Sequence, residues 1–398
     1  MRSGRDGAVL SARRLDKLGV PIAGLVAIGA GLSPFATFSA NRIVLGEPRS
    51  IFEALGAVGG GLTLVGLTTA ALVAVLPTRP LLRLAVSVSA TAVLMVMIGR
   101  AGTHLTPPDV TLARVSPGSG FWVLLFALAL FLTDSLTRLR LSPVQRLVGL
   151  ALAVTAMAVL LGSGAWDDLS ILKEYDSRAP EFWREGRRHV VLALGSLGLA
   201  VITGVPLGVA CNHSPRIRGP LLTGLNFIQT IPSIALFGLL IAPLAWVAAS
   251  VPGAQDLGIS GIGAAPALVA LYAYSLLPVV SNTVVGLDGV SRQAVDAASG
   301  MGMTARQKLL RIEAPLALPV ILAGVRIVLV QNIGLATIAA LIGGGGFGVF
   351  VFQGMGQTAT DLILLGALPT VMMAFVAAVG LDAAVELSER RGAGKRTP

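Results

Sequence analysis

The stretch DGVSRQAVDAASGMGMTARQKLLRIEAPLALP, residues 288–319, is a polar segment that lies between two long apolar runs. Small apolar residues recur on one face of its first part, which predicts an amphipathic helix. Gly300 and Gly302 interrupt this helix, because glycine most readily takes the backbone angles of a tight turn. Thr304 and Gln307 have the spacing of a capping box, so we expect a second helix after the turn.

Pro315 follows this second part and is expected to end its helix just before the next apolar run begins. A short amphipathic hairpin of this kind has a shape that fits a groove on a partner protein. Composition alone is equally consistent with a solvated linker that contacts nothing. The hairpin therefore predicts a partner only if other features of the sequence point to one.

The apolar runs on either side belong to a series that extends along the chain. Of the 398 residues, 54% are hydrophobic and only 13% are charged, well below the roughly 25% typical of soluble proteins. About 20 apolar residues in a helix cross a hydrocarbon core roughly 30 Å thick. The sequence thus predicts an all-α, polytopic membrane helix bundle with about ten transmembrane helices, and it excludes soluble enzymes. The predicted spans are 18–38, 52–76, 81–99, 119–136, 145–164, 189–210, 219–247, 262–286, 317–341 and 361–384.

The 30 Lys and Arg residues are unevenly distributed between the loops of this bundle. If the N-terminus is cytoplasmic and the spans alternate, twenty of them fall inside, nine fall outside and Arg326 lies within a span. The positive-inside rule therefore predicts that both termini are cytoplasmic. The net charge of +10 reflects topology and does not indicate a nucleic-acid partner. Residues 1–17 precede an apolar run longer than a cleaved signal requires, so we expect a signal-anchor helix.

The longest polar stretch, residues 165–188, divides the chain into two halves with five predicted spans each. We expect an N-terminal transmembrane region at 1–164, an extracytoplasmic loop at 165–188, a second membrane domain at 189–388 and a cytoplasmic tail at 389–398. No convincing repeat relates the two halves, so the first is an addition and not a duplicate. The single cysteine, Cys211, excludes a disulfide framework and a cysteine-based metal site within this chain.

The polar segment resembles the cytoplasmic loop of ATP-binding-cassette importer permeases, whose pattern is EAA, three residues, Gly, nine residues, then IxLP. This sequence has Asp296-Ala297-Ala298, then Gly302, then Ile312-Glu313-Ala314-Pro315, with both gaps preserved. Asp296 replaces the glutamate of the pattern and Ala314 replaces the leucine. The spacing holds over twenty residues and in the loop that the charge distribution places inside.

Four further segments resemble the permeases that import glycine betaine, choline, carnitine and related osmoprotectants. The resemblance covers about 200 residues and implies a five-helix importer-type permease core in the C-terminal half, in a bacterial inner membrane. The first 164 residues lie outside this core pattern. The segments are IQTIPSIALFGLL at 228–240, ALYAYSLLPVVSNTVVGLDGV at 270–290, PLALPVILAGVRI at 315–327 and IGLATIAALIGGGGFG at 333–348.

The resemblance also implies partners. A separate cytoplasmic ATPase dimer would receive the hairpin in a surface cleft, a second permease subunit, the same or different, would pair with this one, and an extracytoplasmic solute-binding protein would deliver the substrate. The chain has no GxxxxGK[ST] motif, so we expect no enzyme activity and no cofactor of its own, with ATP bound by the partner. The expected coupling residues are Asp296, Ala297, Ala298, Gly300, Gly302, Arg306 and Pro315.

Polar residues deep in the spans of the second half form a separate group. An unpaired polar group is unfavourable in a bilayer, so each should face a partner or a water-filled path. Hydrogen bonding between helices explains any single one better, whereas together they mark the second half as the translocation unit. Arg326 lies inside its span, and we expect it to snorkel to the membrane boundary. The candidates for the path are Gln229, Thr230, Pro232, Ser233, Tyr274, Asn282 and Asn332.

Aromatic residues make up only 5% of the chain and do not cluster in the spans of the second half. Aromatic faces are the main means of recognising a quaternary ammonium ion, so selection should reside in another protein. The family resemblance implies that this is the extracytoplasmic binding protein. We expect it to dock on the loops 165–188 and 248–261.

Other functions stay open at this point. An ion-coupled secondary transporter would need an acidic residue at a membrane midplane, whereas Asp134 and Asp382 lie near span ends. A membrane sensor or scaffold would use the hairpin as a signalling contact. A permease for another small polar solute, such as an amino acid, is the nearest alternative to an osmoprotectant permease.

Overall fold

The computed structural model describes residues 15–41, 44, 46–106 and 112–394, with side chains up to residue 389. The cations that precede residue 15, and residues 395–398 of the predicted tail, lie outside these ranges. The chain folds into two compact units. The first unit comprises residues up to 141 together with 154–173, and the second comprises 142–153 together with the residues from 174 onward.

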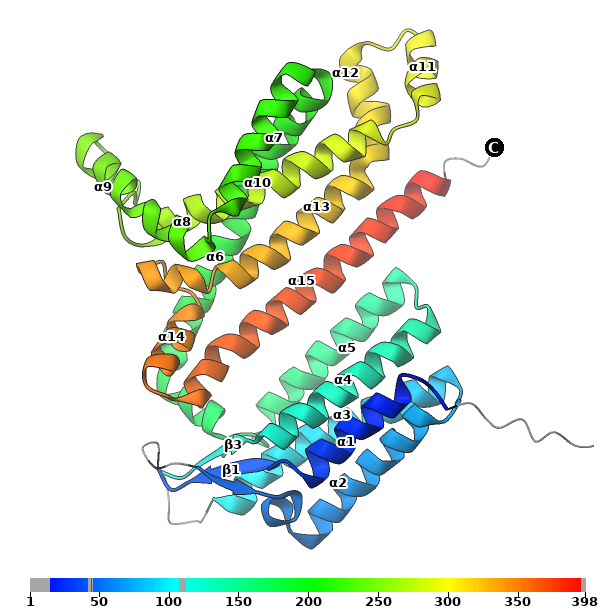
Figure 1. The fold of residues 1–398 in the computed structure, drawn as a ribbon, viewed down its shortest axis with the longest axis vertical. Coiled ribbons are helices and arrows are strands. Elements are labelled where there is room, and N and C mark those ends of the chain that lie inside the picture. The colour runs from blue at the N-terminus through cyan, green and yellow to red at the C-terminus, as the bar shows by residue number, and fades with distance from the viewer. Residues whose placement is uncertain (1–14, 42–43, 45, 107–111, 395–398) are drawn as a thin grey trace, which may run out of the picture. The chain divides into compact units, whose positions relative to one another are not determined.

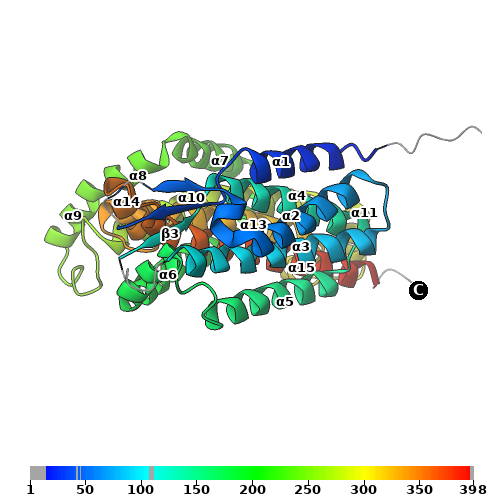
Figure 2. The same cartoon turned by 90° about the horizontal axis from the view of Figure 1, so that it is seen from below.

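The first unit is built on four helices, each of which packs against two others to form a closed ring. α2 begins with a capping box, in which Ser50 and Glu53 each accept a hydrogen bond from the backbone N–H of the other. α3 begins at Pro80, whose fixed φ suits the first turn of a helix. Figure 2 shows α2, α3 and α4 side by side. The helices are α1 Gly19–Gly31, α2 Ile51–Val75, α3 Pro80–Leu105 and α4 Ser119–Leu139, and α5 Pro143–Gly162 belongs partly to each unit.

A small antiparallel sheet lies beside these helices (Figure 1). Its strands are β1 Ala36–Ser39, β2 Glu47–Arg49 and β3 Arg114–Pro117, in the order β2-β1-β3. Ala36 lies opposite Arg49 on one side and opposite Pro117 on the other. The sequence predicted helices alone, because strands of three or four residues are too short for their alternation to be recognised.

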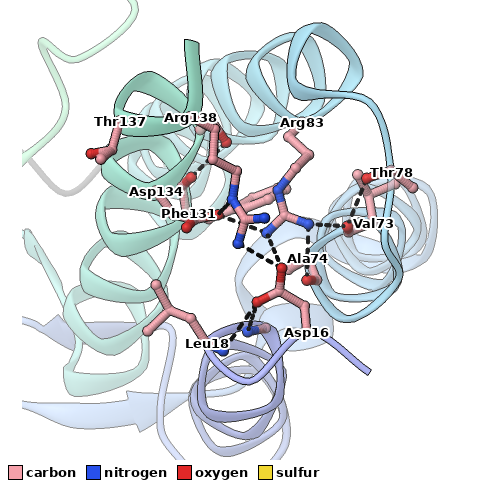
Figure 3. Close-up of polar contacts among 12 residues, drawn as sticks. Asp16, Leu18, Val73, Ala74, Thr78, Arg83, Phe131, Asp134, Thr137 and Arg138 are labelled. Carbon is pink, nitrogen blue, oxygen red and sulfur yellow. Dashed lines mark hydrogen bonds and ion pairs between the residues drawn. The ribbon is translucent and has the colours of Figure 1, made fainter. Parts of the chain in front are cut away.

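Arg83, in the first turn of α3, is fully buried and ties the ends of several helices together (Figure 3). Its Nη1 donates hydrogen bonds to the carbonyl oxygens of Val73, Ala74 and Leu76 at 3.0–3.2 Å, at the C-terminal end of α2. These carbonyls have no partner within the helix, so the guanidinium serves as their cap. Its Nη2 donates to Asp134 of α4 at 2.8 Å.

Asp16 connects the start of α1 to the same cluster. Its Oδ1 accepts hydrogen bonds from the N–H groups of Leu18 and Gly19, and its Oδ2 accepts one from Arg138 at 2.6 Å. Burial raises the pKa of the Asp16 carboxyl, but these two N–H groups and the charges of Arg138 and Arg83 together bring that pKa below its usual value. The cluster therefore fixes the first turn of α1 against α3 and α4.

Among the described residues, nine helices are long and apolar enough to cross a membrane, and the predicted fold class is confirmed. The predicted span 18–38 is wrong, because α1 has only 13 residues. A helix rises about 1.5 Å per residue, so α1 extends about 20 Å and falls short of a hydrocarbon core of about 30 Å. Pro34 follows shortly after α1 and β1 begins at Ala36, which prevents the helix from continuing.

The second unit is a helical assembly in which α10 packs on α13 and α13 packs on α15. Its core contains Phe237 of α8, Leu271 and Tyr274 of α10, and Ala339 of η2. The elements are α6 Ser170–His213, α7 Pro215–Thr230, α8 Ser233–Leu239, α9 Ile241–Ser250, α10 Ala264–Asp288, α11 Arg292–Gly300, α12 Ala305–Lys308, the π-helical turn η1 Leu309–Glu313, α13 Ala314–Leu335, the 3₁₀ turn η2 Ile338–Ile342, α14 Gly348–Gly356 and α15 Thr360–Gly394.

The predicted span 219–247 is divided at Pro232, between α7 and α8. The residue before a proline is disfavoured in the helical region, and Ile231 accordingly has extended angles of φ −71° and ψ 126°. Residues 170–188, which the sequence analysis placed in a loop, extend α6 instead, with non-helical backbone angles at Arg178. Helices therefore continue beyond the apolar runs that hydropathy detects.

Candidate functional site

The first arm of the predicted hairpin, α11, ends in a turn centred on Gly302. Met303 N–H donates to Ala298 O at 3.1 Å and Gly302 N–H donates to Ser299 O at 3.0 Å, which together form a Schellman motif. Gly302 has φ +76°, in the left-handed region that glycine adopts without steric cost. Gly300 has no such angle and lies in the last turn of α11, so only one of the two glycines makes the turn.

The second arm begins with the predicted capping box, which is confirmed. Thr304 N–H donates to Gln307 Oε1 at 2.8 Å, and Gln307 N–H donates to Thr304 Oγ1 at 3.3 Å. Lys308 Nζ then reaches back to the first arm and donates to Ser299 Oγ at 3.0 Å. The helix, turn and helix that the sequence predicts are therefore present, and side-chain hydrogen bonds hold their geometry.

Pro315 does not end the second arm, contrary to the prediction. α12 runs through the π-helical turn η1 into α13, and Ala314 N–H donates to Leu309 O. Pro315 follows the π-helical turn directly, so its missing N–H falls where the winding of the helix changes and does not end the helix. The second arm and the membrane helix thus form one helix of 31 residues, Ala305–Leu335.

The outer surface of the hairpin carries small and polar residues together with the exposed side chain of Met301 at the turn. Asp296, Ala297 and Arg306 are exposed, whereas Ala298 is only 1% exposed and faces inward. Within the part of the chain that the structure describes, neither Asp296 nor Arg306 forms an ion pair. Figure 1 shows α11 and α12 together at the far ends of α10 and α13. This arrangement offers a protruding knob with two exposed charges that can contact another protein.

Three of the predicted path residues gather where α7 gives way to α8. Gln229 Nε2 donates to Tyr274 O at 2.9 Å, and the hydroxyl of Tyr274 donates to Ile231 O. Pro232 cannot supply a backbone donor, and these two contacts hold α10 against the break that it causes. Gln229, Pro232 and Tyr274 therefore lie together, on two elements that are about forty residues apart in sequence.

Asn332 lies in a fully buried polar cluster between α6, α10 and α13. Its Nδ2 donates to Ser196 Oγ and to Ser275 Oγ, both at 2.9 Å. All three residues are 0% exposed. Buried amides that bridge helices stabilise their packing, so this cluster fixes the register of the three helices.

The other predicted path residues bond within their own helices or begin one. Thr230 Oγ1 donates to Phe227 O at 2.7 Å and Asn282 Nδ2 donates to Pro278 O at 2.8 Å. Ser233 is the first residue of α8. In the part of the chain that the structure describes, no hydrogen bond joins these three residues to Asn332. The seven candidates therefore occupy several places along α7, α8, α10 and α13.

The sequence did not predict that two side chains of α6 bind the backbone of the glycine-rich segment 343–348. Gly346 N–H donates to the buried carboxylate of Glu185 at 2.8 Å, and Phe347 N–H donates to His189 Nδ1 at 3.2 Å. His189 Nε2 lies 2.9 Å from Ile333 O, an arrangement that assigns its proton to Nε2. Glu185 and His189 lie four residues apart at the start of an apolar run, and each needs a hydrogen-bond partner once it is buried. This pattern was the signal in the sequence for the contact.

Two family models together cover most of the chain. Residues 16–172 match the N-terminal domain of the ABC transporter permease YehY, and residues 200–393 match the binding-protein-dependent transport system inner membrane component. Over 189 residues the chain is 40% identical to the osmoprotectant import permease protein OsmW of Salmonella typhimurium. These residues are 48% of this chain and 83% of that protein. The chain belongs to the binding-protein-dependent ABC transporter permeases. As a permease of this family it is an inner membrane component of a transport system, and the resemblance seen in the sequence is confirmed.

Another relative of this permease is the glycine betaine/carnitine/choline transport system permease protein OpuCB of Bacillus subtilis, 34% identical over 203 residues, which are 51% of this chain and 84% of that protein. Among solved structures, the inward-facing MetNI methionine ABC transporter aligns over 52% of this chain and 98% of that chain, with 19% identity and a TM-score of 0.46. The permease match at 200–393 contains the hairpin and the polar residues of α7, α10 and α13.

Proposed function

We propose that this permease conducts glycine betaine, choline, carnitine or a related quaternary-ammonium osmolyte across the inner membrane. Relatives at 34–40% identity bear the names of permeases for these osmoprotectants. An extracytoplasmic binding protein would select and deliver the solute, because the chain itself is poor in aromatic residues. Its docking surface would include the loop between α9 and α10 and the start of α6.

The hairpin of α11 and α12 is the element that would couple transport to ATP. A cytoplasmic ATPase dimer would bind ATP and receive the hairpin in a surface cleft, and a second permease subunit would use the other cleft. The observation that carries this proposal is the exposed knob of Asp296, Ala297 and Arg306 on a Schellman turn. Ala297 permits close approach of the backbone, and the two charges can form ion pairs that set the register. Both termini would then be cytoplasmic.

Within the membrane, the path would pass the break at Pro232. The contacts of Gln229 and Tyr274 around this break can be exchanged as α8 moves against α10, whereas the buried cluster of Asn332 is suited to hold its helices together. Thr230, Ser233 and Asn282 would provide polar groups along the same helices. No cofactor is needed in this chain for such a role.

Two glycines of the hairpin allow a matched test. A methyl group at either Gly300 or Gly302 would meet no other atom within 4 Å, so the two sites differ only in backbone angle. Gly302→Ala would place alanine in the left-handed region at a cost of about 1–2 kcal/mol, whereas Gly300→Ala lies in a helix and is tolerated. We expect Gly302→Ala to insert normally but to lose ATP-driven uptake, and Gly300→Ala to transport normally.

The measurement is uptake of labelled glycine betaine by proteoliposomes that contain the permease, its ATPase and its binding protein. Equal uptake by the two variants at equal abundance would contradict coupling through the turn. Uptake that follows an ion gradient without ATP would indicate a secondary transporter, and no uptake of any osmolyte but transport of an amino acid would indicate the other substrate class.

A further inference from the structure

Among the described residues of the second unit, four charged side chains meet beside the C-terminal half of α15. Asp382 of α15 pairs with Arg326 of α13 and, at 2.7 Å, with Nη1 of Arg146 at the start of α5. Arg146 also pairs with Glu386, one turn further along α15. The four side chains are 29–42% exposed, so this cluster is partly open. Arg326, which the sequence predicts to snorkel to the membrane boundary, has a carboxylate partner in Asp382.

A groove of about 660 Å³ adjoins the cluster within the second unit. On α15 its wall is formed by Phe375, Ala378 and Val379, which lie seven, four and three residues before Asp382 and hence on the same helix face. On α13 the wall continues past Arg326 with apolar residues and one amide. The groove is therefore charged at one end and mainly apolar along its length. Its other lining residues are Ile327, Val330 and Gln331.

The predicted spans place two of the charged residues near a membrane boundary. Arg146 is at the beginning of the predicted span 145–164, and Asp382 is near the end of the predicted span 361–384. α13 and α15 run in opposite directions (Figure 1), so the walls that follow Arg326 and precede Asp382 both extend toward the membrane interior. Ile327 and Phe375 are 50% and 61% exposed, so the groove is open at the surface of this unit, within the length of the predicted spans.

We infer that this groove binds one zwitterionic glycerophospholipid, such as phosphatidylethanolamine. Its phosphate would lie between Arg146 and Arg326, which can donate paired hydrogen bonds to phosphate oxygens. Its ammonium would lie against the carboxylates of Asp382 and Glu386, and one acyl chain would follow Phe375 and the apolar residues beyond it. Two cations and two carboxylates match a head group that carries one charge of each sign.

The charge pattern argues against other occupants. An anionic lipid such as phosphatidylglycerol would gain the two arginines but would also face both carboxylates without a compensating ammonium. A free phosphate would contact the arginines but would make no contact with the apolar walls of the groove. A helix of a second copy would have to bury four charges at its edge, which is unfavourable unless each charge finds a new partner.

The test uses the full-length permease, purified in mild detergent and stripped of native lipid. It is incubated with an equal mixture of phosphatidylethanolamine and phosphatidylglycerol, and the lipid that remains bound to each chain is counted by native mass spectrometry. We expect about one retained phosphatidylethanolamine per chain and several-fold less phosphatidylglycerol. Arg326→Gln removes a charge-assisted contact and should reduce retention about tenfold at limiting lipid.

Ala378→Phe tests the groove without touching a charge, because the ring would fill the space between the walls. It should abolish retention while the protein keeps its melting temperature. The matched controls are Arg311→Gln, an exposed arginine on η1, and Ile202→Phe, an exposed position of α6 outside the groove, and both should retain lipid normally.

Equal retention of the two lipids, a preference for phosphatidylglycerol, or retention by Ala378→Phe would each overturn the inference. Disulfide formation between Ala378→Cys residues of two copies would do so too, since it would place a second chain in the groove; the native Cys211 is buried and contributes little background. Lipid retention is measured without transport, so its failure is distinguishable from a failure of the proposed function.

Discussion

Arg83 of the first unit and Arg326 of the second are both arginines within apolar helices, and each is held by an aspartate of a neighbouring helix. The protein surrounds them to very different degrees. The Arg83 side chain is 0% exposed, contacts three carbonyl oxygens and lies 5.1 Å from the centre of the Phe131 ring, whereas the Arg326 side chain is 39% exposed beside a groove. A guanidinium that the protein encloses completely can only hold structure together, while a partly exposed one can exchange its partner for a ligand.

The largest effect is expected from Arg83→Met. The change removes one of the two arginine partners of Asp134, which keeps Arg138, and it removes the cap from three carbonyl groups of α2. Each buried acceptor left unpaired costs about 1–3 kcal/mol, so the first unit should unfold at a clearly lower temperature. Thermal unfolding in detergent, followed by circular dichroism, measures it. Arg79→Met, at an exposed arginine one turn away, is the control and should change stability by less than about 0.5 kcal/mol.

Asp16→Ala should have the next largest effect, about 1–2 kcal/mol, because it removes both a helix cap and an ion pair. Asp16→Asn keeps the oxygen that accepts from Leu18 and Gly19 N–H but loses the charge that faces Arg138. It should therefore retain part of the stability. If the two variants were equally unstable in the same thermal assay, the cap would contribute nothing to fixing α1.

Arg326→Gln should destabilise the second unit by less than about 1 kcal/mol, because a half-exposed ion pair contributes little net free energy. Its contribution should also be sensitive to salt, whereas that of Arg83 should not, since screening acts mainly on exposed charges. Melting temperatures of both variants at low salt and at about 1 M salt test this contrast. A loss as large as that of Arg83→Met would remove the distinction between the two sites.

The smallest expected effect is the loss of the stabilising contribution of Asp16 at low pH. The pKa of Asp16 is lowered in the folded protein, so its contribution to stability is complete above its unfolded value of about 4 and is lost as the pH falls through the folded pKa. Between pH 7 and pH 5 the difference in melting temperature between the native protein and Asp16→Asn should stay constant, and it should shrink only at lower pH. A difference that already shrinks near pH 6 would show that another group is responsible.

Hydropathy predicted most helices because a membrane span is a local property of about 20 consecutive residues. It failed at 18–38, where apolar composition continues past Gly31 but Pro34 and a strand follow. The sheet could not be foreseen, because Ala36 pairs with Pro117 across eighty residues and no local pattern encodes that pairing. Pro232 lies inside the predicted span 219–247, and the size of the break that it causes depends on contacts with α10.

The hairpin was predictable for the opposite reason, since turns and caps depend on neighbours. A glycine at the turn and a Thr304 to Gln307 box specify their own hydrogen bonds. The prediction that Pro315 ends a helix was wrong, because proline is also found within the first turn of helical segments. Only the structure shows that the π-helical turn η1 precedes it. Arg326 with Asp382, and Glu185 with Gly346, are 56 and 161 residues apart, so their pairing had to await the tertiary fold.

The unbroken helix from Ala305 to Leu335 has a mechanical consequence. At about 1.5 Å per residue it is a lever about 45 Å long, and a tilt of about 5° imposed at one tip displaces the other by about 4 Å. A force applied at Arg306, near the start of this helix, would therefore move the opposite end of the helix almost as far. The wider turn of η1 is the one segment of this lever where the winding changes, and it is there that torque could be stored or released.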